Sequence, residues 1–129
     1  MLNLDFGKEI TNIWIDNNDE VFEKSKFANK PFKVLIKPIT RAEFKDFNVR
    51  STHATKGLDN DMFNRLIFMY AVLDWENIGM GGKIVPCNTI NKETFFSRYI
   101  ELSGLISVCC LRGSEVQETM FEDEVKNLV

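Results

Sequence analysis

The sequence contains few of the residues that build catalytic and metal centres. Its 129 residues include one histidine and three cysteines. A structural zinc site needs four Cys or His ligands, and a hydrolase needs a nucleophile, a base and an orienting group in contact. His53 lies in a polar segment, and Cys87 lacks the sequence context of a nucleophile, although spacing alone leaves open a Cys87–His53 pair with an aspartate. We expect no catalytic, cofactor-binding or metal-binding residues, and we expect that the protein is not an enzyme.

Two further patterns fall short of a ligand site. Cys109 and Cys110 are adjacent, so on a helix their side chains point about 100° apart and are poorly placed to share one metal ion. They are better interpreted as small core residues. The segment 79–83 (GMGGK) lacks the Lys-Ser/Thr pair and the following helix of a phosphate-binding loop, which favours a tight turn.

The sequence also has no excess of positive charge. Its 16 Lys and Arg residues are outnumbered by 19 Asp and Glu residues, which gives a net charge of -3. Nucleic-acid-binding domains normally carry a basic patch or stripe. The densest positive stretch, 24–37, follows Glu20 and Glu23, and we interpret it as the solvated edge of a strand pair. We therefore expect no nucleic-acid partner.

Long apolar runs are absent as well. The longest, 66–73, is far shorter than the roughly 20 residues that span a bilayer. Residues 1–10 carry no positive leader before an apolar run, so they do not resemble a signal peptide. An odd number of cysteines without a secretion signal is typical of reduced thiols in a cytosol. We expect a soluble intracellular protein that does not bind membranes.

Enough apolar material is present for one domain. Hydrophobic residues make up 44% of the chain and 11 residues are Phe. A chain of this length buries enough surface to fold without disulfides or metals. No linker divides it, so we expect a single domain over 1–129, with mainly strands in 1–39 and mainly helices in 40–129.

The N-terminal part is typical of a small antiparallel sheet. The run 10–15 is rich in β-branched and aromatic residues, and in 32–37 the apolar residues alternate as in a half-buried strand. A third short strand is expected at 21–24. The fold class is therefore α+β, with this sheet packed on the helical C-terminal part.

Helix signals follow in the second part. Thr40 and Glu43 form a capping box that opens a helix to about Arg50, after which 51–58 is expected to be a loop. Asp59 or Asn60 caps a helix to about Leu73 that is apolar nearly all round and is predicted to be the central core helix. The glycines at 79, 81 and 82 predict a hairpin excursion over about 75–87. A further helix is predicted from Asn91, with Gly104 as a site where it bends or splits.

Three stretches resemble a family of phage tail assembly chaperones. The stretch 32–44 (FKVLIKPITRAEF) is similar to the family's strand, Pro-Leu-Thr-x-x-Glu and helix opening. The stretch 70–93 resembles the family's core helix that ends in a small residue and Trp, followed by a Gly-Lys turn and an apolar-Pro-apolar-polar stretch. The matching residues are Trp75, Gly82, Lys83 and Pro86. Asp74 replaces the common Gly before the Trp, and Cys87 stands where Phe is commoner. The closing stretch 122–127 is also similar to the charged tail of the family.

The resemblance implies a function without chemistry. Such proteins bind the long, helical tape-measure protein in the bacterial cytoplasm and keep it soluble until tail-tube subunits polymerise around it. The tail-tube protein is then a second expected partner, and self-association is compatible with the role. On the last expected helix, which opens at Ser114, the candidate partner-binding residues are Val116, Met120, Phe121 and Val125.

Two alternatives stay open. The last helix could instead pack on its own domain, as amphipathic terminal helices usually do. The protein could also be a structural component of the virion, such as a tail-completion or head–tail joining protein, which would be equally small, acidic and non-enzymatic.

Overall fold

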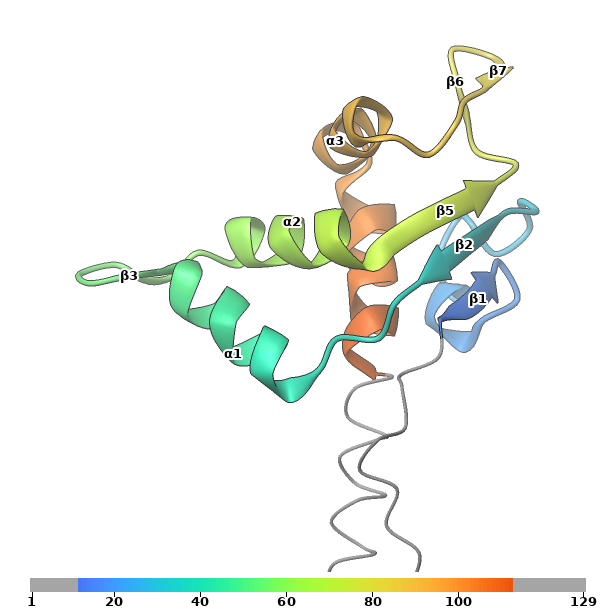
Figure 1. The fold of residues 1–129 in the computed structure, drawn as a ribbon. Helices are drawn as coiled ribbons and strands as arrows, with labels where there is room; N and C mark the ends of the chain where they lie inside the picture. Colours follow the sequence, from blue (N-terminus) through green and yellow to red (C-terminus); the bar gives the residue numbers. More distant parts are fainter. Residues whose placement is uncertain (1–11, 113–129) are drawn as a thin grey trace, which may run out of the picture.

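A computed structural model describes residues 12–112 and confirms the predicted α+β class, with a small antiparallel sheet packed against helices (Figure 1). The elements are the strands β1 (Ile13–Asp16), β2 (Lys33–Ile36), β3 (Thr52–His53), β4 (Gly57–Leu58), β5 (Val72–Glu76), β6 (Gly79–Met80) and β7 (Lys83–Ile84), the 3-10 helix η1 (Glu20–Phe22), and the helices α1 (Arg41–Arg50), α2 (Asn60–Ala71), α3 (Thr89–Arg98) and Ile100–Arg112, hereafter helix 100–112.

The main sheet has three antiparallel strands in the order β1-β2-β5. Alternation puts Val34 and Ile36 of β2 on the buried face, where Val34 lies opposite Ile15 of β1 and Trp75 of β5. A β-bulge interrupts the register between Leu35 and Ile36. Since β2 is the central strand, the prediction that the lysine-rich stretch forms a sheet edge is wrong.

The expected third strand at 21–24 is also wrong, because η1 occupies this segment. The carboxylate of Asp19 accepts a hydrogen bond from the Val21 backbone N–H at 3.1 Å, which caps the 3-10 turn. Phe22 is then fully buried and packs edge-on against Phe32, with ring centroids 5.2 Å apart. Local capping and aromatic burial therefore stabilise a turn here, and β5 takes the third place in the sheet.

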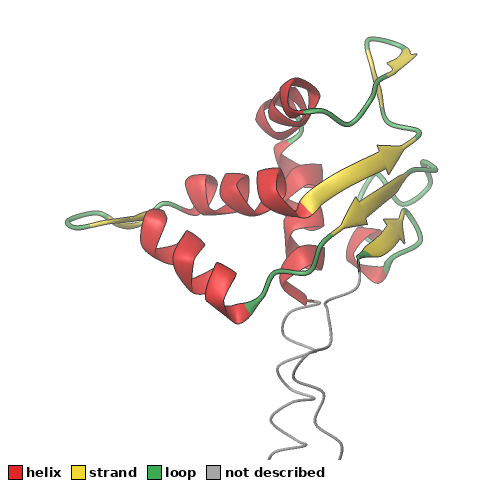
Figure 2. Ribbon diagram, viewed as in Figure 1, coloured by secondary structure: helices red, strands yellow, loops and turns green. Residues whose placement is uncertain are grey.

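Helix α2 runs directly into β5 and extends away from the sheet together with α1, while helix 100–112 passes beside the end of α2 (Figure 2). Ile67 and Phe68 of α2 are fully buried, as is Ile106 of helix 100–112. Cys109 and Cys110 are buried in the same core, as expected for small apolar residues. On α2 the partly exposed Met62 and Tyr70 show that the helix is amphipathic, not apolar all round. The core therefore lies between the sheet, α2 and helix 100–112.

The predicted capping box of α1 is confirmed. Thr40 Oγ1 accepts from the Glu43 N–H at 3.2 Å, and Glu43 Oε1 accepts from the Thr40 N–H at 3.0 Å. Asp59 caps α2 in the same way, by accepting from the Met62 N–H. Between the two helices, the expected loop contains the short hairpin β3–β4, which projects from one end of the molecule (Figure 1).

Helix α2 ends at Ala71, two residues before the predicted end, and the chain continues directly into β5. The Nζ of Lys92 on α3 donates to the carbonyls of Met69 and Val72 at 2.8 and 2.9 Å. The Lys37 N–H donates to the Ala71 carbonyl at 2.8 Å. These donors come from distant segments and satisfy carbonyls that a helix end leaves unpaired.

The predicted helix from Asn91 differs in two ways. Its cap is Asn88, whose side chain accepts from the Asn91 N–H at 2.8 Å, while the Asn91 side chain donates to the Pro86 carbonyl. The helix also breaks at Tyr99, where α3 and helix 100–112 meet at a bend of 113°. Gly104 lies inside helix 100–112, so it does not mark the break.

Candidate functional site

The structure separates the residues of the one catalytic arrangement that spacing had left open. His53 lies on β3, where its Nε2 is 3.7 Å from Asp59 Oδ2. Cys87 lies between β7 and α3, at the other end of the molecule (Figure 1). Burial of Cys87 raises its pKa, which further reduces its nucleophilic character. A Cys87–His53 pair is therefore excluded by the fold.

Two absences concern residues 12–112 only. No three His, Cys, Asp or Glu side chains in that range cluster as metal ligands would. No single helix there is long and apolar enough to cross a membrane, although α3 and helix 100–112 together reach that length and composition across their bend. The expected partner-binding residues Val116, Met120, Phe121 and Val125 lie outside the described residues.

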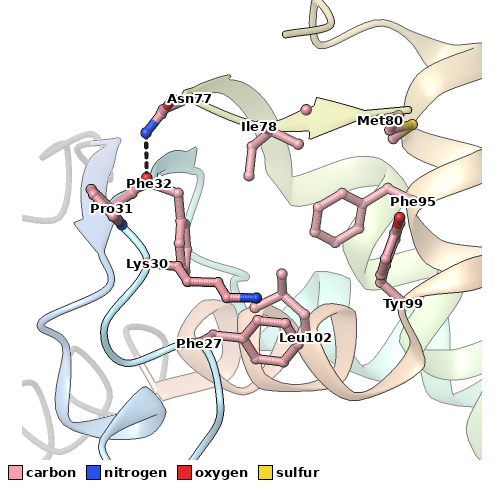
Figure 3. A pocket seen from close by; sticks show the side chains of 11 residues that line it. Phe27, Lys30, Pro31, Phe32, Asn77, Ile78, Met80, Phe95, Tyr99 and Leu102 are labelled. Carbon is pink, nitrogen blue, oxygen red and sulfur yellow. Dashed lines mark hydrogen bonds between the residues drawn. The ribbon is translucent and has the colours of Figure 1, made fainter. Parts of the chain in front are cut away.

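The clearest candidate site is an apolar pocket at the break between α3 and helix 100–112 (Figure 3). Its volume is about 180 Å³. Phe27 and Phe32 lie across the pocket from Phe95 and Tyr99. The full lining consists of Phe27, Lys30, Pro31, Phe32, Asn77, Ile78, Gly79, Met80, Phe95, Tyr99 and Leu102.

Trp75 packs against Phe95, which forms one wall of the pocket. The two rings stack with centroids 5.5 Å apart and an angle of 28° between their planes. The indole Nε1 donates to the Val85 carbonyl at 2.8 Å, which ties β5 to the segment that follows the β6–β7 hairpin. Phe95 also stacks on Phe68 of the core at 5.3 Å. The wall of the pocket is thus continuous with the hydrophobic core.

The mouth of the pocket is closed on one side by a polar contact. The Asn77 side chain donates to the Pro31 carbonyl at 2.5 Å, so the loop before β2 and the end of β5 are held together (Figure 3). Asn77 has a φ of 61°, a left-handed conformation that Asn tolerates better than most residues. The positive φ of Gly81 and Gly82 then turns the chain so that Lys83 pairs with Met80.

Lys30 is the only charged residue in the described lining of the pocket. Its side chain extends from the loop before β2 toward Leu102 (Figure 3). The ion pairs found within residues 12–112 do not include Lys30 or its neighbour Lys26. The Lys26 Nζ lies 5.3 Å from the centroid of the Phe27 ring, which lines the pocket. Two positive charges therefore border an apolar pocket.

A second hollow lies on the other side of Pro31 and Asn77. It has a volume of about 310 Å³ and includes Asp16, Lys33 and Glu76, which face one another across the sheet. The cross-strand order Asp–Lys–Glu lets opposite charges neutralise each other. We therefore place the candidate site in the apolar pocket.

The sequence also singled out Trp75, Gly82, Lys83 and Pro86, which lie outside the described lining of the pocket. Trp75 stacks on the Phe95 wall, Gly82 lies in the turn after Met80, and Lys83 pairs with Met80 across the β6–β7 hairpin. The carbonyl of Pro86 accepts from the Asn91 side chain at 2.9 Å, which joins the hairpin to α3. Trp75 belongs to the main sheet, so the expected hairpin over 75–87 is shorter and is confined to β6 and β7.

The sequence alone did not identify this pocket. The sequence predicts one helix through Phe95 and Tyr99, whereas the structure breaks it at Tyr99 and places both rings across the pocket from Phe27 and Phe32. The available signal was the interleaving of Lys and Phe in 22–32, which resembles neither a regular strand nor a helix. Comparisons with protein-family models, with curated proteins and with solved structures found no match to this chain.

The geometry of the site suits binding. Its walls are aromatic and aliphatic, and the two polar residues of its lining, Lys30 and Asn77, are exposed. Small-molecule and cofactor sites usually measure about 300–1,000 Å³. A volume of about 180 Å³ is smaller than this range, and it fits a single large side chain of a partner protein.

Proposed function

We propose that this protein is a non-enzymatic phage tail assembly chaperone. It binds the tape-measure protein in the cytoplasm of the bacterial host and keeps it soluble until the tail tube polymerises, with the tail-tube protein as a further partner. The proposal is supported by the resemblance of the stretches 32–44 and 70–93 to that family.

One structural observation carries the proposal. The family-like residue Trp75 stacks on Phe95 and binds the Val85 carbonyl, so it supports both a wall of the apolar pocket and the base of the hairpin beside it. The stretch 70–93, which resembles the chaperone family, therefore supplies Asn77, Ile78, Gly79 and Met80 to the lining of the pocket, and its Trp75 supports the Phe95 wall.

The mechanism is the covering of apolar surface. A long helical protein exposes apolar stripes before the tube assembles around it, and exposed stripes of this kind aggregate. A pocket that takes one side chain gives a small, weak interface, as is typical of transient complexes. Weak binding suits a chaperone, because tail-tube subunits must displace it during assembly.

The exposed ring of Tyr99 provides the variant that tests this mechanism. Tyr99 lines the pocket and is 42% exposed, so Tyr99→Ala shortens a wall without opening the core. Ile90 on α3 is 77% exposed and lies outside the lining, so Ile90→Ala is the matched control. We expect Tyr99→Ala to weaken binding of the tape-measure protein about tenfold, because the partner's side chain loses an aromatic wall and tyrosine is a frequent hot-spot residue at interfaces.

The experiment is coexpression of the chain with the tape-measure protein of the same phage. The soluble fraction of the tape-measure protein and its co-purification with the tagged chain are measured, and finished particles are examined by mass spectrometry. We expect the chain to raise the soluble fraction, Tyr99→Ala to lose much of this effect and the particles to lack the chain. A fixed copy number in finished particles, with no effect on the tape-measure protein, would instead identify a tail-completion or head–tail joining protein.

A further inference from the structure

We propose that the pocket is selective for acidic amphipathic helices. One large apolar side chain of the partner enters the pocket, and Lys30 pairs with an Asp or Glu about one turn away on the same helix. This inference rests on the proposed function, since that function supplies a helical protein as the partner, but the selectivity is argued from the pocket itself.

The apolar part of the ligand follows from the lining. Phe32, Phe95 and Leu102 are buried and form the inner part of the pocket, while Met80 and Tyr99 are partly exposed at its edge. Aromatic rings and a methionine adapt to side chains of different shapes. The volume of about 180 Å³ admits one such side chain.

The acidic part follows from the charges. Lys30 lies in the lining, and the Lys26 ammonium lies over the ring of Phe27. Neither lysine takes part in the ion pairs found within residues 12–112. No acidic residue is among the described residues that line the pocket. A ligand that enters here meets the exposed positive charge of Lys30 in a described lining without carboxylates, so a carboxylate on the ligand stabilises the complex and an ammonium destabilises it.

Helix geometry sets where the carboxylate must be. Residues three and four positions apart lie on the same face of a helix, about one turn apart. When the apolar side chain points into the pocket, a carboxylate at one of these positions lies at the mouth. The contact between Asn77 and Pro31 fixes this side of the mouth before the ligand arrives, which reduces the ordering needed on binding.

The test uses the full chain and three synthetic peptides of about 18 residues, a length at which isolated helices begin to form. Each peptide has one Phe and the same apolar stripe, with Glu, Gln or Lys at the positions three and four residues from the Phe. Binding is measured by fluorescence anisotropy of a labelled peptide. Because exposed ion pairs change affinity modestly, we expect the Glu peptide to bind about threefold more tightly than the Gln peptide and about tenfold more tightly than the Lys peptide.

Reversing the charge of Lys30 gives the decisive variant. We expect Lys30→Glu to reverse the order of the Glu and Lys peptides, and Lys30→Gln to remove most of the preference. Lys56→Glu makes the same charge change in the segment between β3 and β4, at the far end of the molecule, and should leave the order unchanged. Circular dichroism checks that each variant is folded. Equal binding of the three peptides, or an order that Lys30→Glu does not alter, would overturn the inference.

The two proposals fail in different ways. If the peptides follow the expected charge order but the tape-measure protein is neither bound nor kept soluble, the selectivity stands and the chaperone function is wrong. If Tyr99→Ala impairs the tape-measure protein while Lys30→Glu has no effect on it or on the peptides, the chaperone function stands and the acidic selectivity is wrong.

Discussion

Trp75 stacks on Phe95, with ring centroids 5.5 Å apart, while its Nε1 donates a hydrogen bond to the Val85 carbonyl at 2.8 Å. One side chain thus joins the main sheet, helix α3 and the segment after the hairpin. Because Phe95 lines the apolar pocket, the stability of the fold and the shape of the candidate site depend on the same contact.

Shortening Trp75 in two steps should separate its two contacts. Trp75→Phe keeps a ring against Phe95 but leaves the Val85 carbonyl without its donor, and we expect it to lower the free energy of unfolding by about 1–2 kcal/mol. Trp75→Ala also removes the stack and should cost about 3–5 kcal/mol. Urea denaturation followed by circular dichroism measures both. Trp14→Phe is the matched control, because Trp14 is 44% exposed, and it should change stability by less than about 0.5 kcal/mol.

The ion pair between Asp19 and Arg112 should make stability depend on acidic pH. Both guanidinium nitrogens donate to the Asp19 carboxylate, at 3.1 and 2.8 Å. Burial alone raises the pKa of Asp19, but the hydrogen bonds from Arg112 and the Val21 N–H and the Arg112 charge outweigh it, so the pKa is lowered. A lowered carboxyl pKa stabilises the fold above the unfolded-state value of about 3.9, and this contribution is lost as the pH falls through the folded-state pKa.

Asp19→Asn isolates that charge, because Asn also caps the 3-10 turn well. We expect it to be about 1–2 kcal/mol less stable than the natural chain at pH 7, and the difference should shrink steadily below about pH 4. Urea midpoints measured from pH 2 to pH 7 give the comparison. Glu20→Gln is the control. It removes an exposed carboxylate, whose Oε1 lies 3.6 Å from Nη1 of the same Arg112. A difference that stays constant with pH would show that the pair contributes no charge-dependent stability.

Lys92 should stabilise the junction between α2 and β5. Its Nζ donates to the carbonyls of Met69 and Val72, and Lys92→Met keeps the aliphatic chain but leaves both carbonyls without this donor. We expect a loss of about 2–3 kcal/mol, because partly buried acceptors remain unpaired. Lys45→Met, at an exposed position on α1, should be nearly neutral. Thermal and urea unfolding measure the effect, and equal stability of the two variants would contradict it.

The three cysteines should differ in their reactivity toward alkylating reagents. Burial raises the pKa of Cys109 to about 11 and that of Cys110 to about 12. Cys87 is only half buried, although burial raises its pKa as well. Because the thiolate is the reactive form, iodoacetamide at pH 8 should modify Cys87 first and the buried pair only after unfolding. Mass spectrometry of native and denatured samples shows the order, and rapid native labelling of Cys110 would contradict its burial.

Local signals predicted their elements well. Thr40 and Glu43 form the capping box of α1, and Asp59 caps α2, because each cap involves residues only three positions apart. The alternation of Phe32, Val34 and Ile36 predicted a strand with one buried face, and all three are buried. Such features need no information about distant parts of the chain.

One error arose within a short stretch of the chain, and another arose where distant segments meet. The segment at 21–24 has the composition of a strand, but Asp19 caps a 3-10 turn there and Phe22 is buried against Phe32. The predicted helix to Leu73 is two residues too long, because Lys37 and Lys92 supply donors to its last carbonyls. These partners are far away in the sequence, so no local pattern contains them.

The sequence by itself determined the α+β class, the caps of the first two long helices and the buried cysteines Cys109 and Cys110. Only the tertiary structure decided that β5 completes the sheet and that the chain breaks at Tyr99. It also decided that Lys30 faces an apolar pocket built from three separate segments. The physical reason is the separation in sequence between the residues that interact. Helix caps and strand alternation involve residues a few positions apart, whereas a pocket forms only when the core has fixed where each segment lies.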